Sequence, residues 1–209
     1  MRSLLTIALR TTLLTLLLTG LLYPLAVTGA ARVLFPARAS GSWLSDERGQ
    51  VVGSELLAQG FSSPSYFQPR PSAAGASGYD ATASGGSNLG PTSKKLRDGA
   101  AELLKKLETD NPAAPRPVPA ELVTASASGL DPHLSPEGAQ WQLRRVAAAR
   151  GLSEERVRAV VAAHTEERTF GFLGEPRVNV LALNLALDRQ FGRPSLPPPA
   201  HEAPAPAAH

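Results

Sequence analysis

The pattern of apolar and polar residues divides the chain into an uncharged N-terminal block and a longer region in which short apolar stretches alternate with polar ones. No charged residue lies between Arg10 and Arg32. A helix over the residues between them, TTLLTLLLTGLLYPLAVTGAA, would be about 30 Å long, which is the thickness of the hydrocarbon core of a bilayer. The block therefore predicts one membrane-spanning helix.

A cleaved signal peptide is the alternative explanation of this block. The small residues Thr28, Gly29 and Ala30 resemble a cleavage site. However, the apolar region of a cleavable signal is usually only about 7 to 15 residues long. The length of the block therefore favours an uncleaved anchor. The positive charges on its two sides nearly balance and only slightly favour a cytoplasmic N-terminus.

Beyond the anchor, the patterns predict a small mixed domain of the α+β class. Short apolar pieces over residues 51 to 57 suit strands and turns, and residues 122 to 125 suit another short strand. Residues 62 to 93 are rich in Ser, Gly and Ala, a composition typical of flexible linkers. Because this region also holds aromatic rings and specific hydrogen-bonding groups, we interpret it as an ordered surface loop.

Helix signals follow this loop. Pro91 suits the first turn of a helix with an apolar stripe, and a Pro-rich connector over residues 111 to 119 ends that helix. A second helix is expected to begin at Ser135 and to end at Gly151. Ser153 is expected to cap a third. The stripe of the first helix consists of Leu96, Leu103, Leu104 and Leu107.

The C-terminal part of the chain combines an apolar segment with a Pro-rich tail. Residues 178 to 187 carry no charge and are predicted to be helical. The tail over residues 193 to 209 is rich in Pro and Ala and is expected to be disordered. We therefore expect an anchor region over residues 1 to 35, one domain over residues 36 to 192, and this tail.

Composition excludes several classes of function. The chain has 21 Lys and Arg against 18 Asp and Glu, without a long run of like charges, so nucleic acid is not an expected partner. It has no cysteine, which rules out disulfides, thiolate metal sites and cysteine nucleophiles. His164 follows an apolar helix face, and no carboxylate lies at ligand spacing from it or from His133. No metal site is therefore predicted.

The segment YDATASGGSNLGPTSKKL resembles a phosphate-binding P-loop. Gly85, Gly90 and Thr92 occupy the fixed positions of that motif, but Pro91 stands where the motif has its lysine. Proline supplies neither the cation nor a backbone donor for a phosphate. The sequence therefore predicts a Gly-rich turn before a helix, which can attract an anion only weakly.

A second cluster suggests a hydrolase. Ser126, Ser128, Asp131 and His133 lie close together in the sequence. The members of a catalytic triad normally come from separate elements of a fold, and no G-x-S-x-G elbow is present. No catalytic residue is therefore assigned. A membrane-anchored extracytoplasmic hydrolase stays open as an alternative, as does an envelope-binding protein.

Four blocks following one anchor resemble the KdpC family, a subunit of the bacterial potassium-transporting Kdp ATPase. They are YFQPRPSA, YDATASGGSNLGPTS, ELVTASASGLDPH and GEPRVNVLALNLALD, and the resemblance extends to about Asp188. Their order and spacing are more specific than any single block. The resemblance implies a non-enzymatic accessory subunit of a high-affinity potassium uptake system in the bacterial cytoplasmic membrane.

The resemblance also implies partners and a role. The partners are a channel-like potassium-binding subunit and a P-type ATPase subunit that hydrolyses ATP. The family is described as a catalytic chaperone that raises the affinity of the ATPase subunit for ATP, whereas the domain is placed outside the cytoplasm, where ATP is not available. A Ser/Gly signature of the family would correspond to candidate nucleotide contacts at Ser84, Gly85, Gly86 and Ser87, or at Ser126, Ser128 and Gly129. ATP is expected only through the ATPase partner.

Residue types indicate candidate contacts with these partners. Interfaces favour aromatic residues and Arg, although such residues could equally hold their own loop together. In the anchor, Gly20 and Gly29 would allow close contact with a partner helix, with a lone lipid-exposed helix as the alternative. The candidates in the domain are Tyr66, Phe67, Arg70 and Asn88.

Overall fold

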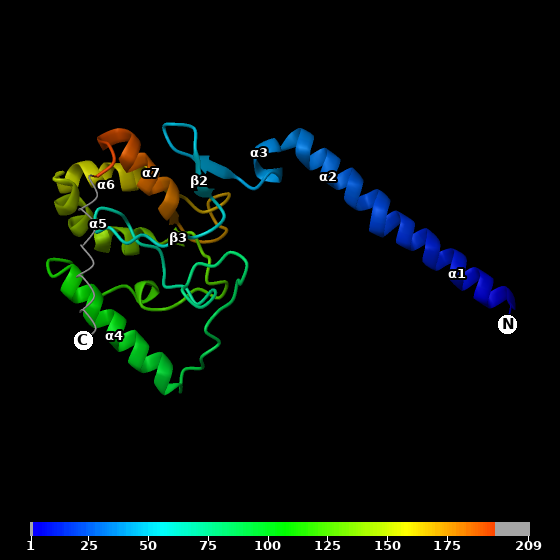
Figure 1. Cartoon of the computed structure of the whole chain (residues 1–209), viewed down its shortest axis with the longest axis horizontal. Coiled ribbons are helices and arrows are strands. Elements are labelled where there is room, and N and C mark those ends of the chain that lie inside the picture. The colour runs from blue at the N-terminus through cyan, green and yellow to red at the C-terminus, as the bar shows by residue number, and fades with distance from the viewer. Residues whose placement is uncertain (1, 195–209) are drawn as a thin grey trace, which may run out of the picture. The chain divides into compact units, whose positions relative to one another are not determined.

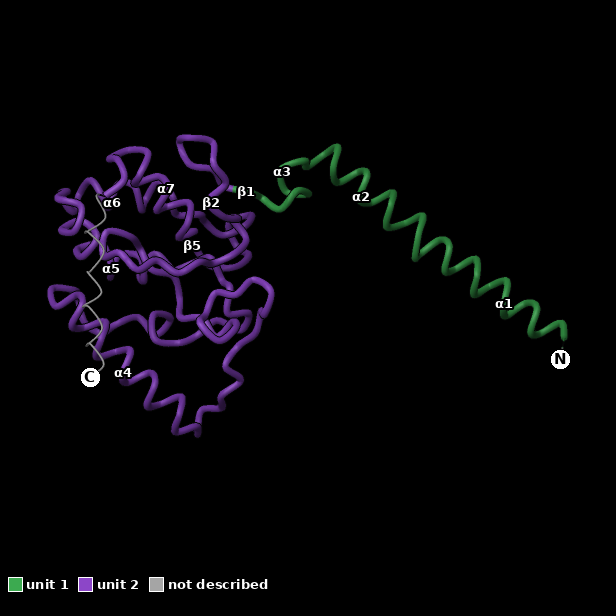
Figure 2. Tube along the Cα trace, in the orientation of Figure 1, with its two compact units in different colours: residues 1–43 green, residues 44–209 purple. Residues whose placement is uncertain are grey.

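The computed structural model describes residues 2 to 194. The chain forms two compact units, residues 1–43 and the residues from 44 onwards (Figure 2). The tail predicted to be disordered covers residues 193 to 209, and all of it except Arg193 and Pro194 lies outside the described residues. The predicted limit of the anchor region at residue 35 stays a prediction.

The first unit is built from a long apolar helix. It comprises α1 (Arg2–Leu17), a π-helical turn (Leu18–Leu22) and α2 (Tyr23–Leu34), followed by the short α3 (Pro36–Ala39). The run from Arg2 to Leu34 is long and apolar enough to cross a membrane, and none of its residues is buried in the protein. The hydroxyl of Thr15 donates to the carbonyl of Thr11 at 2.9 Å, and such bonds remove a polar group from a lipid environment.

The second unit is a small mixed α/β domain with two small sheets (Figure 1). β1 (Trp43–Ser45) pairs with β2 (Val51–Ser54). In the other sheet, β5 (Arg177–Asn179) lies between β3 (His133–Leu134) and β4 (Thr165–Glu166) and is antiparallel to both. The predicted α+β class and the short strands near residue 51 are confirmed.

Helices supply most of the core. α5 (Pro136–Arg150) packs against α6 (Glu154–Ala163), and α6 packs against α7 (Val180–Phe191). α4 (Lys94–Asp110) has no fully buried residue, but Leu107 near its C-terminal end packs against this core (Figure 1). The largest fully buried apolar side chains come from the long loop, the strands and the helices: Phe67, Leu134, Leu143, Leu183, Leu187, Val146, Val157, Val178 and Val180.

The caps explain why these helices begin and end where they do. The Ser135 side chain accepts a hydrogen bond from the Gly138 amide, and Ser153 caps α6 in the same way. Gly151 ends α5 with φ 64°, a left-handed conformation that glycine adopts without strain. Asn179 caps α7 by accepting from the Ala182 amide. Three of the four helices predicted after the anchor are therefore confirmed, although residues 178 and 179 of the last belong to β5 and α7 begins at Val180.

Two predictions of local structure are wrong. Pro91 is not in a helix, because Ser93 is the N-cap and α4 begins at Lys94. The segment from 122 to 125 is not a strand: a 3₁₀ turn covers Ala120–Leu122, and the Thr124 hydroxyl donates to the Ala120 carbonyl at 2.9 Å. In both cases Ser or Thr side chains bond the local backbone, which favours turns over extended structure.

Candidate functional site

The two Ser/Gly segments singled out in the sequence lie against each other. The Gly85 amide donates to the Ser128 carbonyl at 2.9 Å, and the Ser84 hydroxyl donates to the same oxygen at 3.0 Å. In the second segment, the Gly129 amide donates to the Ser126 carbonyl at 3.2 Å. The segments 84–87 and 126–129 therefore form one paired loop structure, which we call the Ser/Gly loop pair.

Glycines allow this close approach. A Cβ on Gly86 would lie 2.8 Å from the Ala127 carbonyl oxygen. A Cβ on Gly129 would lie 2.6 Å from the Gly85 oxygen and 2.7 Å from the Ala74 amide nitrogen. Gly129 also has φ 68°, a conformation that L side chains rarely adopt. Backbone packing thus accounts for both glycines.

The serine hydroxyls of the pair are engaged in turns. Ser126 is 4% exposed, and its Oγ accepts from the Asp131 amide at 3.4 Å. The Ser128 Oγ accepts from the Leu130 amide at 3.1 Å. Ser87, in contrast, is exposed. A phosphate cradle needs free amides and hydroxyls, whereas the Gly85 and Gly129 amides and three of the four serine hydroxyls bond within the pair or its turn, so the pair fits a structural role better than a nucleotide site.

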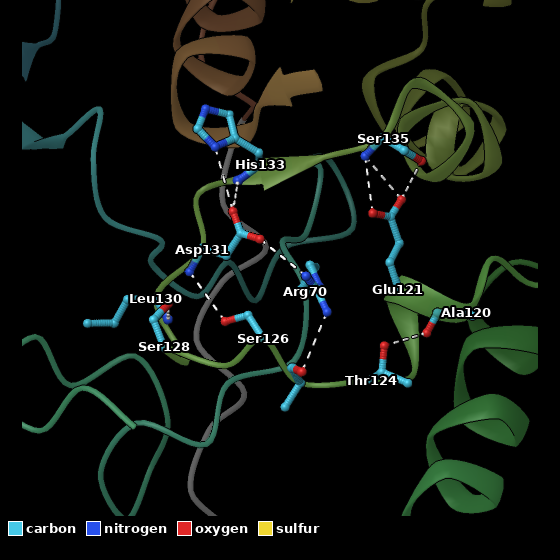
Figure 3. A network of polar contacts seen from close by, with 11 residues as sticks. Arg70, Ala120, Glu121, Thr124, Ser126, Ser128, Leu130, Asp131, His133 and Ser135 are labelled. Atoms are coloured by element: carbon cyan, nitrogen blue, oxygen red, sulfur yellow. Dashed lines mark hydrogen bonds and ion pairs between the residues drawn. The ribbon is translucent and has the colours of Figure 1, made fainter. Parts of the chain in front are cut away.

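An ion-pair network adjoins the loop pair (Figure 3). Arg70 Nη1 lies 3.2 Å from Asp131 Oδ2, which ties the long loop to the segment before β3. The other oxygen of Asp131 accepts from the His133 backbone amide at 3.1 Å and lies 3.6 Å from His133 Nδ1. His133 lowers the pKa of Asp131 most, and Arg70 lowers it further, against the opposing effect of partial burial.

This network does not have the geometry of a Ser-His-Asp triad. Ser126 Oγ accepts from the Asp131 amide, while the His133 ring lies on the other side of the Asp131 carboxylate (Figure 3). Among residues 2 to 194, no hydrogen bond joins Ser126 or Ser128 to His133. A triad requires the imidazole to accept the serine proton. The hydrolase alternative therefore gains no support from the geometry.

The sequence reading missed a carboxylate beside the network. Both oxygens of Glu121 accept from the Ser135 amide at 3.1 Å, and the Ser135 hydroxyl donates to Oε1 at 2.6 Å (Figure 3). A Cβ on Gly138 would collide with the same oxygen. Glu121 thus places negative charge at the N-terminus of α5, where the helix dipole favours it.

The candidate docking residue Phe67 is completely buried in the core. Its amide donates to Asn184 Oδ1 and its carbonyl accepts from Asn184 Nδ2, both at 2.9 Å. Gln142 holds the backbone of Gln68 through the same pair of bonds, also at 2.9 Å. The two amide side chains therefore pair with the loop as a neighbouring strand would. Both residues could have been found in the sequence, because a polar side chain on the apolar face of a helix needs a hydrogen-bonding partner when it is buried.

Tyr66 and Arg70 also have partners within the domain. The Tyr66 hydroxyl donates to Asp188 Oδ2 at 2.9 Å, and burial, followed by this bond, raises the pKa of Tyr66. Arg150 lies 4.9 Å from the centre of the Tyr66 ring and pairs with Asp188 at 2.8 Å. Asn88 is exposed and has φ 52°. Of the four docking candidates, Phe67 has no exposed surface to offer and Asn88 has the freest side chain.

The two glycines of the anchor lie on open helix surface. The space beside Gly29 is empty within 4 Å, and Gly20 faces only the Leu16 side chain at 3.5 Å. Gly20 belongs to the π-helical turn, a distortion often found at functional positions. Over the described part of the chain, no group of three or more potential metal-ligating side chains occurs.

Comparison with known families places this geometry in context. Residues 5 to 189 match the model of the KdpC family, described as "K+-transporting ATPase, c chain". The chain belongs to the KdpC family. The KdpC match begins in α1 and ends in α7, so it includes the anchor helix, the Ser/Gly loop pair and the Arg70–Asp131 network.

Curated relatives agree with this assignment, and each carries the name "Potassium-transporting ATPase KdpC subunit". A protein of Myxococcus xanthus is 68% identical over 185 residues, which cover 88% of this chain and 87% of the relative. A protein of Rhodospirillum rubrum is 57% identical, covering 84% of this chain and 90% of the relative. A protein of Variovorax paradoxus is 56% identical, covering 82% of this chain and 88% of the relative. The resemblance of the four sequence blocks to KdpC is confirmed.

Proposed function

We propose that this chain is a non-catalytic accessory subunit of an ATP-driven, high-affinity potassium uptake pump. The observation that carries the proposal is the match of residues 5 to 189 to the KdpC family model, together with relatives named as KdpC subunits of potassium-transporting ATPases. The polar groups that resembled catalytic or nucleotide-binding motifs are used inside the domain, which supports an accessory role. ATP hydrolysis then belongs to a P-type ATPase subunit, and potassium binding to a channel-like subunit.

The proposed location is the bacterial cytoplasmic membrane. The helix from Arg2 to Leu34 would anchor the chain, with its N-terminus in the cytoplasm and its domain outside. Outside the membrane, the domain would cover or steady the entrance of the channel-like subunit. A selective potassium path needs rings of oxygen ligands, so it is assigned to that partner.

Assembly would occur at least partly within the bilayer. Helices in lipid associate by close packing because burial of apolar surface gains little there. The open surfaces at Gly20 and Gly29 support such packing against a partner helix. Replacing either glycine by leucine would then weaken assembly, whereas leucine at the neighbouring Ala30 would serve as a control on the same helix.

The proposed influence on ATP is indirect. In the proposed topology the domain and the nucleotide lie on opposite sides of the membrane. The engaged amides of Gly85 and Gly129 also argue against a direct phosphate contact. The chain would act as a catalytic chaperone through the complex, by stabilising a form of the ATPase subunit that binds ATP more tightly.

Copurification and topology test the proposal. A tagged chain should elute from detergent with a P-type ATPase and a channel-like subunit, and the complex without this chain should have a higher KM for ATP. Because the chain has no cysteine, Ser87→Cys and Ser3→Cys give clean reporters on the two sides of the helix. In intact cells, an impermeant maleimide should label only the cysteine at 87. Labelling only at 3, or purification without companions, would refute the proposal.

A further inference from the structure

The hairpin between β4 and β5 carries an exposed apolar tip that the proposed function does not use. Phe170 is 83% exposed, Phe172 is 70% exposed and Leu173 is 49% exposed. They lie within the uncharged sequence TFGFLG, residues 169 to 174, which we call the aromatic tip. Adjacent exposed large apolar side chains of this kind mark contact with a protein or with a membrane.

The aromatic tip is held in a defined and strained shape. Thr169 and Leu173 exchange backbone hydrogen bonds of 2.9 and 3.0 Å. Phe170 has φ 56° and Gly171 has φ 80°. Positive φ at two successive residues is typical of type I′ turns, where Asn-Gly is favoured and a bulky residue is strained. Strain of this kind, kept at a surface position, indicates a function that requires the ring to point outward.

Of the five charged residues that flank the aromatic tip, four are paired with each other, and the fifth, Glu167, is exposed. Arg168 forms an ion pair with Glu175, and Arg177 Nη2 lies 2.8 Å from Glu166 Oε2. These pairs join the two arms of the hairpin on both sides of the tip. Approach to an apolar phase therefore does not require the loss of water from an unpaired charge at these four positions.

The anchor places a lipid surface within reach of this tip. The membrane-spanning helix ends at Leu34 and β1 begins at Trp43. Even a fully extended connection of this length spans only about 30 Å, which is comparable to the diameter of a small domain. The domain is therefore tethered within about one domain diameter of the bilayer, and lipid is the apolar phase that the chain itself supplies.

We propose that the aromatic tip inserts into the lipid interface and gives the domain a second point of attachment to the membrane. The occupant is the headgroup and upper acyl region of a bilayer, because the tip is uncharged and needs no anionic partner. Phe170 and Phe172 supply the apolar surface, and the paired charges at the base stay in water. This inference requires the anchor helix, but it does not require assembly with a pump.

Depth-dependent quenching tests the inference on the full chain alone. Thr169→Cys retains both rings, and a polarity-sensitive fluorophore can be attached there because the chain has no other cysteine. The labelled chain is reconstituted into phosphatidylcholine vesicles with or without doxyl groups near the headgroup. The expected result is blue-shifted emission and loss of fluorescence with doxyl lipid. The same fluorophore on Ser87→Cys, which is also exposed, is the control and is expected to lose less.

A second variant separates insertion from folding. Phe170→Asn with Phe172→Ser removes both rings, and Asn tolerates the left-handed backbone at 170. This double variant should fold as the parent does, but the label at 169 should lose its blue shift and its quenching. Unquenched label in the parent, or equal quenching in the double variant, would overturn the inference. Crosslinking of the tip to a copurified subunit, without quenching by lipid, would assign it to a protein partner instead.

This test and the test of the proposed function fail separately. Quenching at the aromatic tip in a chain that purifies without companions would leave the lipid contact intact and refute the accessory role. A complete complex whose tip stays in water would do the opposite.

Discussion

Gly129→Ala tests whether the Ser/Gly loop pair is a structural device rather than a nucleotide site. The added methyl group would meet two kinds of resistance. The backbone at Gly129 has φ 68°, and the new Cβ would lie within 2.6 to 2.8 Å of the Gly85 oxygen, the Ala74 nitrogen and the Ala74 Cβ. Two of these three atoms belong to the backbone, so neither can rotate away as a side chain would.

The two effects can be separated and estimated. A left-handed backbone costs alanine about 1 kcal/mol relative to glycine. Overpacking against fixed atoms costs about 1–3 kcal/mol more. Gly129→Ala should therefore lower the free energy of unfolding of the domain by about 2–4 kcal/mol. That is a large part of the stability of a small domain, which is typically about 5–15 kcal/mol.

Three other glycines provide matched controls. Gly151→Ala meets the left-handed backbone but has no atom within 4 Å, so it should cost about 1 kcal/mol. Gly86→Ala meets the Ala127 oxygen at 2.8 Å without a positive φ, so only the overpacking cost of about 1–3 kcal/mol applies. Gly90→Ala meets neither and should change stability by less than about 0.5 kcal/mol.

Urea unfolding of the full chain in detergent measures this series. Trp141 is 3% exposed in the core, so its fluorescence should follow unfolding of the domain, and Trp43→Phe in every variant removes the only other tryptophan signal. Equal stability of Gly129→Ala and Gly151→Ala would refute the argument, because it would mean that the loop pair yields to the added methyl group. A change in ATP affinity of the complex without any loss of stability would restore the nucleotide reading.

Two further predictions concern ion pairs and use the same unfolding measurement. Arg150→Met leaves the nearly buried Asp188 with only the Tyr66 hydroxyl and the more distant Arg193, and should cost about 3 kcal/mol. Arg158→Met breaks an exposed pair and should cost less than about 1 kcal/mol; similar losses would contradict this. Because the folded pKa of Asp131 lies below its usual 3.8, its stabilisation is present above that pH and is lost as the pH falls further. Asp131→Asn should therefore cost about 1 kcal/mol at pH 7 and less at pH 3; a loss that does not depend on pH would refute the ionic explanation.

Local signals in the sequence were sufficient for most of the helices. Ser135, Ser153 and Asn179 each accept from the amide three positions onward, so each helix start is encoded within a few residues. The helix after the Gly-rich loop shows the limit of such signals. Pro91 and Ser93 both suit a helix start, but the helix begins after Ser93. The Ser93 hydroxyl accepts a hydrogen bond from the Leu96 amide, whereas a proline only lacks an amide that would otherwise have no partner.

Long-range pairings were beyond such signals. Nothing near Ser84 indicates that its hydroxyl meets the Ser128 carbonyl, and nothing near Glu121 indicates that it binds the Ser135 backbone. Local pattern also gave the wrong structure for residues 122 to 125, because apolar alternation cannot reveal that the Ala120 carbonyl accepts from nearby groups. These contacts depend on how loops return to one another, which no periodicity records.

The polar groups that resemble catalytic or nucleotide-binding motifs in this sequence lie in loops that are held in place by hydrogen bonds within the domain. Asn184 and Gln142 hold the backbone of the long loop at Phe67 and Gln68. Further along the same loop, the Ser72 hydroxyl donates to the Gly129 carbonyl of the Ser/Gly loop pair at 2.6 Å. A loop fixed at so many points has little freedom to close around a ligand, because closure would break backbone pairs that are costly to lose. Substitutions in these motifs should therefore change transport in proportion to lost domain stability. Measuring stability and ATP affinity on the same variants would show whether any motif departs from that proportion and contacts ATP itself.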